Sequence, residues 1–184
     1  MRYGLAALQD TKVAFQAQDV AGKEGTDTTV VTAAQLPPGR YRLRLAAFDA
    51  AGRTGTVELP VTVGLRAAGP LQFSDLIVGV SHQAFAPAVH TRAGQPLDTL
   101  LELYSADPAL FGSVTVTCEV RKGGDPAVVA STVSALRQTE LERRLLAQGQ
   151  VTTAGWLPGE YTVSAVISVN GTPTGRVSRS IVVE

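Results

Sequence analysis

A turn motif that occurs twice constrains this chain more than any other feature. Residues 36–41 read LPPGRY and residues 157–161 read LPGEY, which places Tyr41 and Tyr161 at an offset of 120 residues. Self-similarity at a fixed distance is the signature of repeated structural units. A repeat of this length matches an immunoglobulin-like (Ig-like) β-sandwich of about 100 residues.

The match extends beyond the motif and relates residues 30–63 to residues 151–184. The further pairs at this offset are Leu36 with Trp156, Pro38 with Pro158, Gly39 with Gly159, Gly55 with Gly175, Val57 with Val177, Val61 with Ile181, and Val63 with Val183. Both copies alternate apolar and polar residues, which is typical of strands with one buried face. We therefore predict an all-β fold of two tandem Ig-like or fibronectin-type antiparallel β-sandwiches, the first of them short or truncated.

The repeated motif predicts a tyrosine corner in each sandwich. Pro and Gly impose a turn, and Gly39 and Gly159 stand just before Tyr41 and Tyr161, each of which is the first inward residue of a strand. In a tyrosine corner the hydroxyl of a buried ring bonds to nearby backbone. A tyrosine that stacks on a sugar is the alternative.

Three arginines alternate with these inward residues in the first copy. Arg40, Arg42 and Arg44 fall on the strand face opposite Tyr41. Such a stripe can attract an acidic partner. It can also be a solvated sheet face with cross-strand neighbours such as Glu58.

A shorter repeat relates residues 13–26 to residues 43–56. Each copy predicts a strand, a D-x-x-G turn and a second strand, with Asp19 or Asp49 capping its own turn. Calcium binding is the alternative reading. Each turn supplies only one or two carboxylates, however, whereas calcium takes six to eight oxygen ligands.

The second half predicts further strands and one ambiguous segment. We expect strands over 71–80, 96–105, 113–122 and 127–136, and a loop with a short edge strand over 81–95. Residues 139–148 predict a short helix or irregular turn, because Thr139 and Glu142 fit a capping box; a strand phase through Leu141, Arg143 and Leu145 is the alternative. Asn170-Gly171 predicts a hairpin turn, which also accounts for its match to a glycosylation sequon.

Arg179 breaks the pattern of the last strand, since it takes the inward phase that Leu59 holds in the first copy. An inward arginine near a sheet end usually pairs with a carboxylate or reaches out of the core. Glu102 and Asp98 are the expected partners.

The repeat also predicts the domain organisation. We expect a short or N-terminally incomplete sandwich over 1–66, a linker over 67–72 and a complete sandwich over 73–184. Measured against the repeat, the first sandwich lacks its N-terminal portion. Either it begins before Met1, or it is a reduced sandwich, or an absent partner completes it.

Charge and hydropathy narrow the classes of partner. Sixteen basic residues balance sixteen acidic ones, so no basic surface for nucleic acid is indicated. No run reaches the roughly 20 apolar residues of a membrane span, and residues 1–15 have no signal-peptide pattern. We expect no nucleic-acid binding and no membrane insertion; the partners would be other domains of the same polypeptide or another protein.

Catalytic and metal-binding motifs are missing from the sequence, and we predict no catalytic residues, no cofactor and no metal. Cys118 lies in an alternating run and reads as a small core residue. His82 and His90 share one loop and read as exposed side chains. With Asp75 or Asp98 they could form a weak metal site, and we keep both histidines as possible interaction residues.

The motifs together resemble a known bacterial architecture. Leu36 to Arg42, Asp49 and Gly52 precede Ser74 to Leu76, and then come Leu157 to Tyr161 and Gly175 to Arg179. This succession is similar to the tandem C-terminal Ig-like region of bacterial exported proteins that carry a von Willebrand factor A-related domain. The D-x-S-x-S adhesion motif of those A domains is missing here. The resemblance implies an extracellular, periplasmic or cell-envelope location, with a cytoplasmic one left open.

The sequence thus predicts a non-catalytic structural or protein-interaction module of a larger cell-envelope or secreted protein. The alternative is a carbohydrate- or peptide-binding accessory module that uses loop 81–95 or the domain junction near 64–72. An enzyme is the third and weakest hypothesis.

Overall fold

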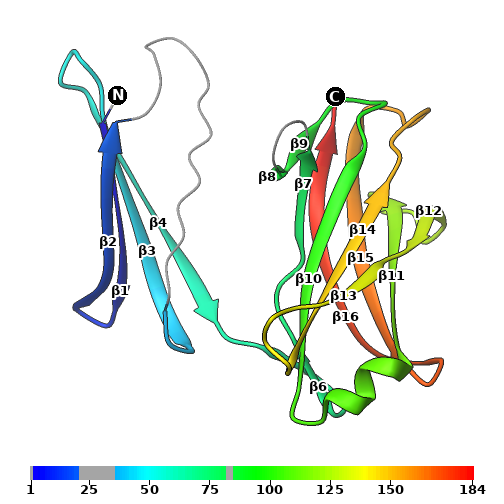
Figure 1. The fold of residues 1–184 in the computed structure, drawn as a ribbon. Helices are drawn as coiled ribbons and strands as arrows, with labels where there is room; N and C mark the ends of the chain where they lie inside the picture. The colour runs from blue at the N-terminus through cyan, green and yellow to red at the C-terminus, as the bar shows by residue number, and fades with distance from the viewer. Residues whose placement is uncertain (1, 21–35, 82–84) are drawn as a thin grey trace. The chain divides into compact units, whose positions relative to one another are not determined.

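The computed structural model describes residues 2–20, 36–81 and 85–184 (Figure 1). These residues are almost entirely strands and turns, and their one helix is a 3-10 helix, η1 (Pro108–Ser113). The chain divides into two compact units, Met1–Gly64 and Leu65–Glu184. In the part of the chain described, no helix is long and apolar enough to cross a membrane.

The first unit contains one four-stranded antiparallel sheet with the order β2-β1-β3-β4. Its strands are β1 (Arg2–Gln9), β2 (Lys12–Val20), β3 (Gly39–Phe48) and β4 (Thr54–Val63). The alternation in β3 puts Tyr41, Leu43 and Leu45 on one face and the arginines on the other. The predicted β3–β4 hairpin is confirmed.

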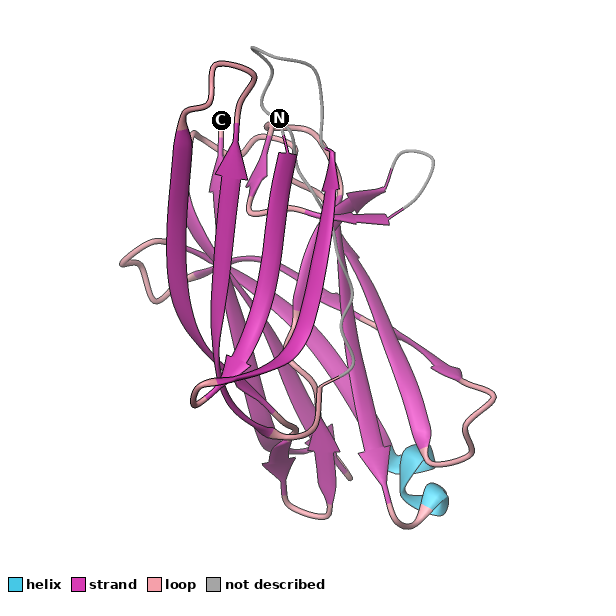
Figure 2. Ribbon diagram, turned by 90° about the vertical axis from the view of Figure 1, so that its left-hand side faces the viewer, coloured by secondary structure: helices cyan, strands magenta, loops and turns pink. Residues whose placement is uncertain are grey.

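The second unit is a sandwich of two sheets. Figure 2 shows the strands of the chain in magenta and the short helix η1 in cyan. One sheet has the order β13-β14-β10-β6-β5, with β7 paired to β10 and β8 to β7; the other has the order β12-β11-β15-β16-β9. The strands of the first sheet are β5 (Arg66–Ala68), β6 (Leu71–Phe73), β7 (Ile77–Ser81), β8 (Phe85–Pro87), β10 (Leu97–Ser105), β13 (Ala135–Gln138) and β14 (Arg144–Val151). Those of the second are β9 (His90–Thr91), β11 (Val114–Lys122), β12 (Val128–Val133), β15 (Gly159–Val169) and β16 (Thr172–Val183).

The core of this unit lies between its two sheets. Strand β10 alternates strictly, so that Leu97, Leu101 and Leu103 are buried. They share one apolar cluster with Val163 and Ile167 of β15. The strand order corresponds to the Ig-like pattern, with an A-B-E-D sheet facing a C-F-G sheet. The all-β prediction is confirmed, and the sandwich is seen in this unit.

The internal repeat is preserved in strand pairing as well as in sequence. In the β3–β4 hairpin Tyr41 pairs with Val61, and in the β15–β16 hairpin Tyr161 pairs with Ile181. The following partners keep the offset of 120: Leu43 with Leu59 and Val163 with Arg179, Leu45 with Val57 and Ala165 with Val177, Ala47 with Gly55 and Ile167 with Gly175.

The correspondence continues into the strands beside each hairpin. β1 pairs with β3 through Ala7 and Leu43, as β11 pairs with β15 through Val120 and Val163. The register of β1 with β2 shifts just after Ala7, and that of β11 with β12 just after Val120. The sheet β2-β1-β3-β4 therefore matches β12-β11-β15-β16 strand for strand and has the strand order of the C-F-G sheet in the second unit.

Three predictions need correction. The expected linker, 67–72, instead contributes to the β5–β6 hairpin of the second unit. The expected strand over 71–80 is two strands, because Ser74 leaves the sheet and its hydroxyl accepts the Glu102 amide. Residues 139–148 contain no helix; the irregular turn that is the other form of this prediction is present over 140–143, and the strand alternative is seen from Arg144 onward as β14, which lies between β10 and β13.

Arg179 does not pair with Glu102 or Asp98. Its Nε donates to the Leu76 carbonyl at 3.2 Å, while Glu102 pairs with Arg144. The side chain is exposed, so the arginine reaches out from the inward phase. The Asn170-Gly171 hairpin turn is confirmed, with φ angles of 51° and 76° that suit such a turn.

Candidate functional site

Both tyrosine corners are formed. The Tyr41 hydroxyl donates to the Pro37 carbonyl at 2.8 Å, and the Tyr161 hydroxyl donates to the Leu157 carbonyl at 2.8 Å. Both rings are buried, and the Tyr161 ring stacks on Trp156 with centroids 4.7 Å apart. These hydroxyls and rings are therefore engaged in structure rather than offered to a ligand.

The glycines of the motif serve the same turns. Gly159 has a φ of 141°, in the region that favours glycine. A Cβ on Gly39 would come within 3.0 Å of Gln9 Nε2 and 3.4 Å of the Tyr41 ring. Each glycine lets the chain enter its strand close to the buried tyrosine.

The arginine stripe has cross-strand carboxylate partners. Arg44 and Arg42 both pair with Glu58 of β4, and Arg42 also donates to the Asp10 carbonyl at 3.3 Å. These groups are about half exposed, and exposed pairs contribute little stability. Together with exposed Arg40 they keep this face of the sheet in water.

The turn Asp49–Gly52 closes the β3–β4 hairpin through its aspartate. One Asp49 oxygen accepts the Arg53 amide at 2.8 Å, and the other accepts Arg53 Nε at 2.5 Å. These hydrogen bonds from Arg53 lower the pKa of the Asp49 carboxyl below its ordinary value. Calcium at this turn would have to displace them. The companion turn after Asp19 lies outside the described residues.

The proposed histidine site is not assembled by the described residues. His90 Nδ1 lies 3.2 Å from Glu184, Asp75 pairs with Arg66, and Asp98 accepts Gln150 Nε2 at 2.9 Å. His82 lies outside the described residues. Within residues 2–20, 36–81 and 85–184, no group of three or more His, Cys, Asp or Glu side chains gathers.

Cys118 is buried between the two sheets of the second unit, as predicted. Its sulfur lies 3.1 Å from Thr99 Oγ1 and 3.5 Å from Ser134 Oγ. A Cβ on Gly149 would come within 3.1 Å of the sulfur. Thr99, Ser134 and Gly149 thus enclose the thiol, which is typical of a structural cysteine.

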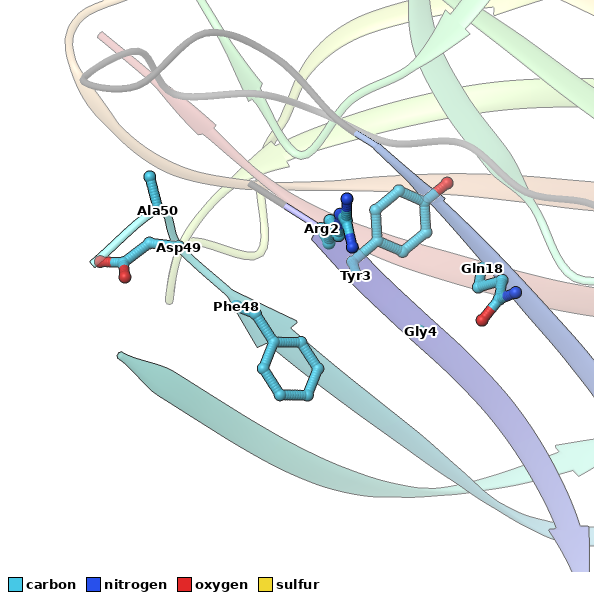
Figure 3. Close-up of a pocket in the computed structure, with 7 residues that line it drawn as sticks. All are labelled: Arg2, Tyr3, Gly4, Gln18, Phe48, Asp49 and Ala50. Atoms are coloured by element: carbon cyan, nitrogen blue, oxygen red, sulfur yellow. The ribbon is translucent and has the colours of Figure 1, made fainter. Parts of the chain in front are cut away.

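Sequence reasoning missed an open hollow of about 860 Å³ at one end of the first sheet (Figure 3). It is lined by Arg2, Tyr3 and Gly4 of β1, Gln18 of β2, Phe48 of β3, and Asp49 and Ala50 of the turn. Figure 3 shows the labelled side chains coming from β1, β2, β3 and the turn that follows β3. Such a mixed wall suits polar contacts to a peptide or sugar, and only the pairing of β1 with β3 brings Arg2 beside Phe48.

A second hollow, of about 470 Å³, lies beside the β5–β6 hairpin. Its polar side chains come from Gln72, Tyr104, Ser105 and Arg143. Burial raises the pKa of the Tyr104 hydroxyl, and its 2.6 Å hydrogen bond to Glu102 raises it further. This hollow includes part of the segment 64–72 that the sequence suggested for ligand binding.

One face of the sheet in the first unit is apolar and partly exposed: Ala7 on this face is buried, whereas other members are open to solvent. We call it the open face and define it by Leu5, Ala7, Phe15, Ala17, Leu43, Leu45, Val57, Leu59 and Val61, which share one side of the sheet. Leu59 is 55% exposed and Val57 is 45% exposed. Large exposed apolar patches mark interaction surfaces.

The fold defines an all-β protein, in which one unit is a β-sandwich and the described residues of the other form a single sheet with a partly exposed apolar face. No protein-family model matches the chain, and no curated protein matches it.

Proposed function

We propose that this chain is a non-catalytic structural and protein-interaction module of a larger bacterial cell-envelope or secreted protein. One observation carries the proposal: the open face presents Leu45, Val57 and Leu59 to solvent on a sheet whose counterpart is covered in the second unit. A face patterned for a sandwich interior is a surface that a protein partner would bury.

The roles of the chemically reactive side chains support this proposal. Asp49 braces a turn, Cys118 is enclosed in a core, and Tyr161 ties a strand to its turn. The envelope location rests on the resemblance of the repeated motifs to Ig-like regions of exported proteins. Tandem modules of this kind commonly space or position other domains.

Photo-crosslinking in the cells that naturally express the chain tests the interaction role. A photoreactive phenylalanine derivative at position 59 sits on the open face, and the same derivative at position 48 sits on the opposite face. Leu59 and Phe48 are 55% and 49% exposed, so both positions tolerate the change. We expect crosslinked protein from position 59 at several times the yield from position 48.

The identity of the crosslinked protein does not affect this test. A partner protein, another domain or a second copy of the chain would each support an interaction module. Equal yields from the two positions, or none from position 59, would overturn the proposal.

A second candidate is carbohydrate or peptide binding at the hollow beside the β5–β6 hairpin. Tyr104 and Arg143 give this hollow an aromatic ring and a cation next to the suggested segment. A glycan array with the purified chain, repeated with Arg143→Ala, tests it. Glycan binding that the substitution abolishes supports this candidate, and failure to bind any glycan removes the sugar version.

A further inference from the structure

The internal repeat shows what kind of surface covers an Ig-type sheet of this chain. Val57 and Val177 are valines at equivalent positions of the repeat, yet Val57 is 45% exposed and Val177 only 4%. A Cβ on Gly175 would come within 2.7 Å of Ala68 and 3.1 Å of Phe73, which belong to the facing sheet. A Cβ on the equivalent Gly55 would meet nothing within 4 Å. The cover in the second unit is therefore another antiparallel sheet, packed face to face.

We propose that this chain forms a homodimer in which the open faces of two first units pack against each other and complete one sandwich. The proposal deepens the interaction role given above and rests on it. It assigns a surface, the open face, and an occupant, the same surface of a second copy.

A second copy is the partner that the described residues favour. Both sheets of the second unit already bury their inner faces against each other, as Leu101 and Val163 do within one cluster. The matching apolar sheet face that remains in the described chain is the open face itself. A surface that packs on its own copy gives a closed two-fold dimer, the commonest oligomer.

The area of the open face is sufficient for a specific contact. Four strands spaced by about 4.8 Å, each rising about 3.3 Å per residue, make a face of roughly 19 by 30 Å. Two such faces bury up to roughly 1,100 Å² before the relief of the side chains is counted, just above the roughly 1,000 Å² expected of a biological interface.

The opposite face of the same sheet is unsuited to this contact. It carries Arg40, Arg42 and Arg44, together with Glu58, which forms ion pairs with Arg42 and Arg44. Burying these charges against the same charges of a second copy would be costly. The sheet therefore has one side for water and one for a partner.

Sedimentation equilibrium of the purified 184-residue chain tests the proposal. We expect a mass twice the 19.2 kDa of one chain. Leu59→Lys and Val57→Lys each put a charge into the interface and should weaken the dimer at least tenfold. Phe48→Lys changes an equally exposed residue on the opposite face and should leave the dimer intact.

Circular dichroism verifies that each variant is folded, and either of the two open-face variants suffices for the comparison. A wild-type chain that stays monomeric at the highest soluble concentration overturns the dimer. So does a dimer that Phe48→Lys weakens as much as Leu59→Lys, or one that no lysine variant weakens. A monomeric chain whose position 59 crosslinks to another protein in cells would overturn only the dimer and leave the interaction role standing.

Discussion

Val57 and Val177 stand at the same place in two copies of one hairpin, and only Val177 is buried. Full burial of a valine side chain stabilises a protein by roughly 1.5–3 kcal/mol relative to exposure. The second unit gains this stabilisation from its facing sheet. The first unit does not gain this free energy until a partner covers the open face. Association should therefore raise the free energy of unfolding of the first unit.

A glycine pair tests whether the facing sheet makes this difference. Gly175→Ala should destabilise the second unit by about 1–3 kcal/mol, because the added methyl group meets Ala68 and Phe73. Gly55→Ala should change the stability of the monomeric chain by no more than about 0.5 kcal/mol, since no atom of the described residues lies near its Cβ. Urea denaturation followed by circular dichroism measures both, and equal effects would contradict the assignment of an uncovered sheet.

Removing a single oxygen atom tests whether the tyrosine corner stabilises the second unit. Tyr161→Phe removes the hydroxyl that donates to the Leu157 carbonyl and should cost about 1–2 kcal/mol. Trp156, the chain's one tryptophan, stacks on this ring, so its fluorescence reports unfolding of this unit. Tyr41→Phe is the control, because it changes the other unit; an unaltered midpoint for Tyr161→Phe would contradict the structural role.

The β15–β16 turn should depend on the backbone of Asn170. Its φ of 51° is left-handed, which asparagine tolerates better than alanine. Asn170→Ala should destabilise the second unit by about 1 kcal/mol. Asn170→Gly, which adopts this conformation freely, should come close to the wild type in the same urea titration; equal losses would show that the asparagine side chain matters instead.

The Asp49 turn should respond to acid. Arg53 lowers the pKa of the folded Asp49 carboxyl below the ordinary 3.8, so its contribution is present above that pH and is lost as the pH falls through the folded pKa. Carbon-detected NMR titration should place the Asp49 midpoint below 3.8, and Arg53→Met should move it upward. A midpoint that Arg53→Met leaves in place would show that Arg53 is not the cause.

The residue preferences of turns allowed the two hairpins, β3–β4 and β15–β16, to be predicted from the sequence. The turn and the tyrosine corner restrict which residues can stand at their positions. The glycine and tyrosine therefore recur at one offset, as Gly39 with Tyr41 and Gly159 with Tyr161, and they locate both hairpins. β1 and β2 escaped detection as a repeat because alternation alone relates them to β11 and β12, and unequal loops remove the common offset.

Two other features depend on tertiary context that local sequence does not contain. Thr139 does accept the Leu141 amide, as a cap would, but pairing of β14 with β10 overrides the helix preference that follows. The hollow lined by Arg2 and Phe48 exists only because β1 pairs with β3. Long-range pairing of this kind leaves no local signal.

The end of the second unit has a mechanical consequence. β9 runs parallel to β16, and the Val182 and Glu184 amides donate to the Val89 and Thr91 carbonyls at 2.7 and 2.9 Å. Tension applied between Val89, just before β9, and Glu184 would slide the two strands past each other in shear. The hydrogen bonds would then be loaded together instead of opening one after another, so this short strand pair works as a clamp against stretching.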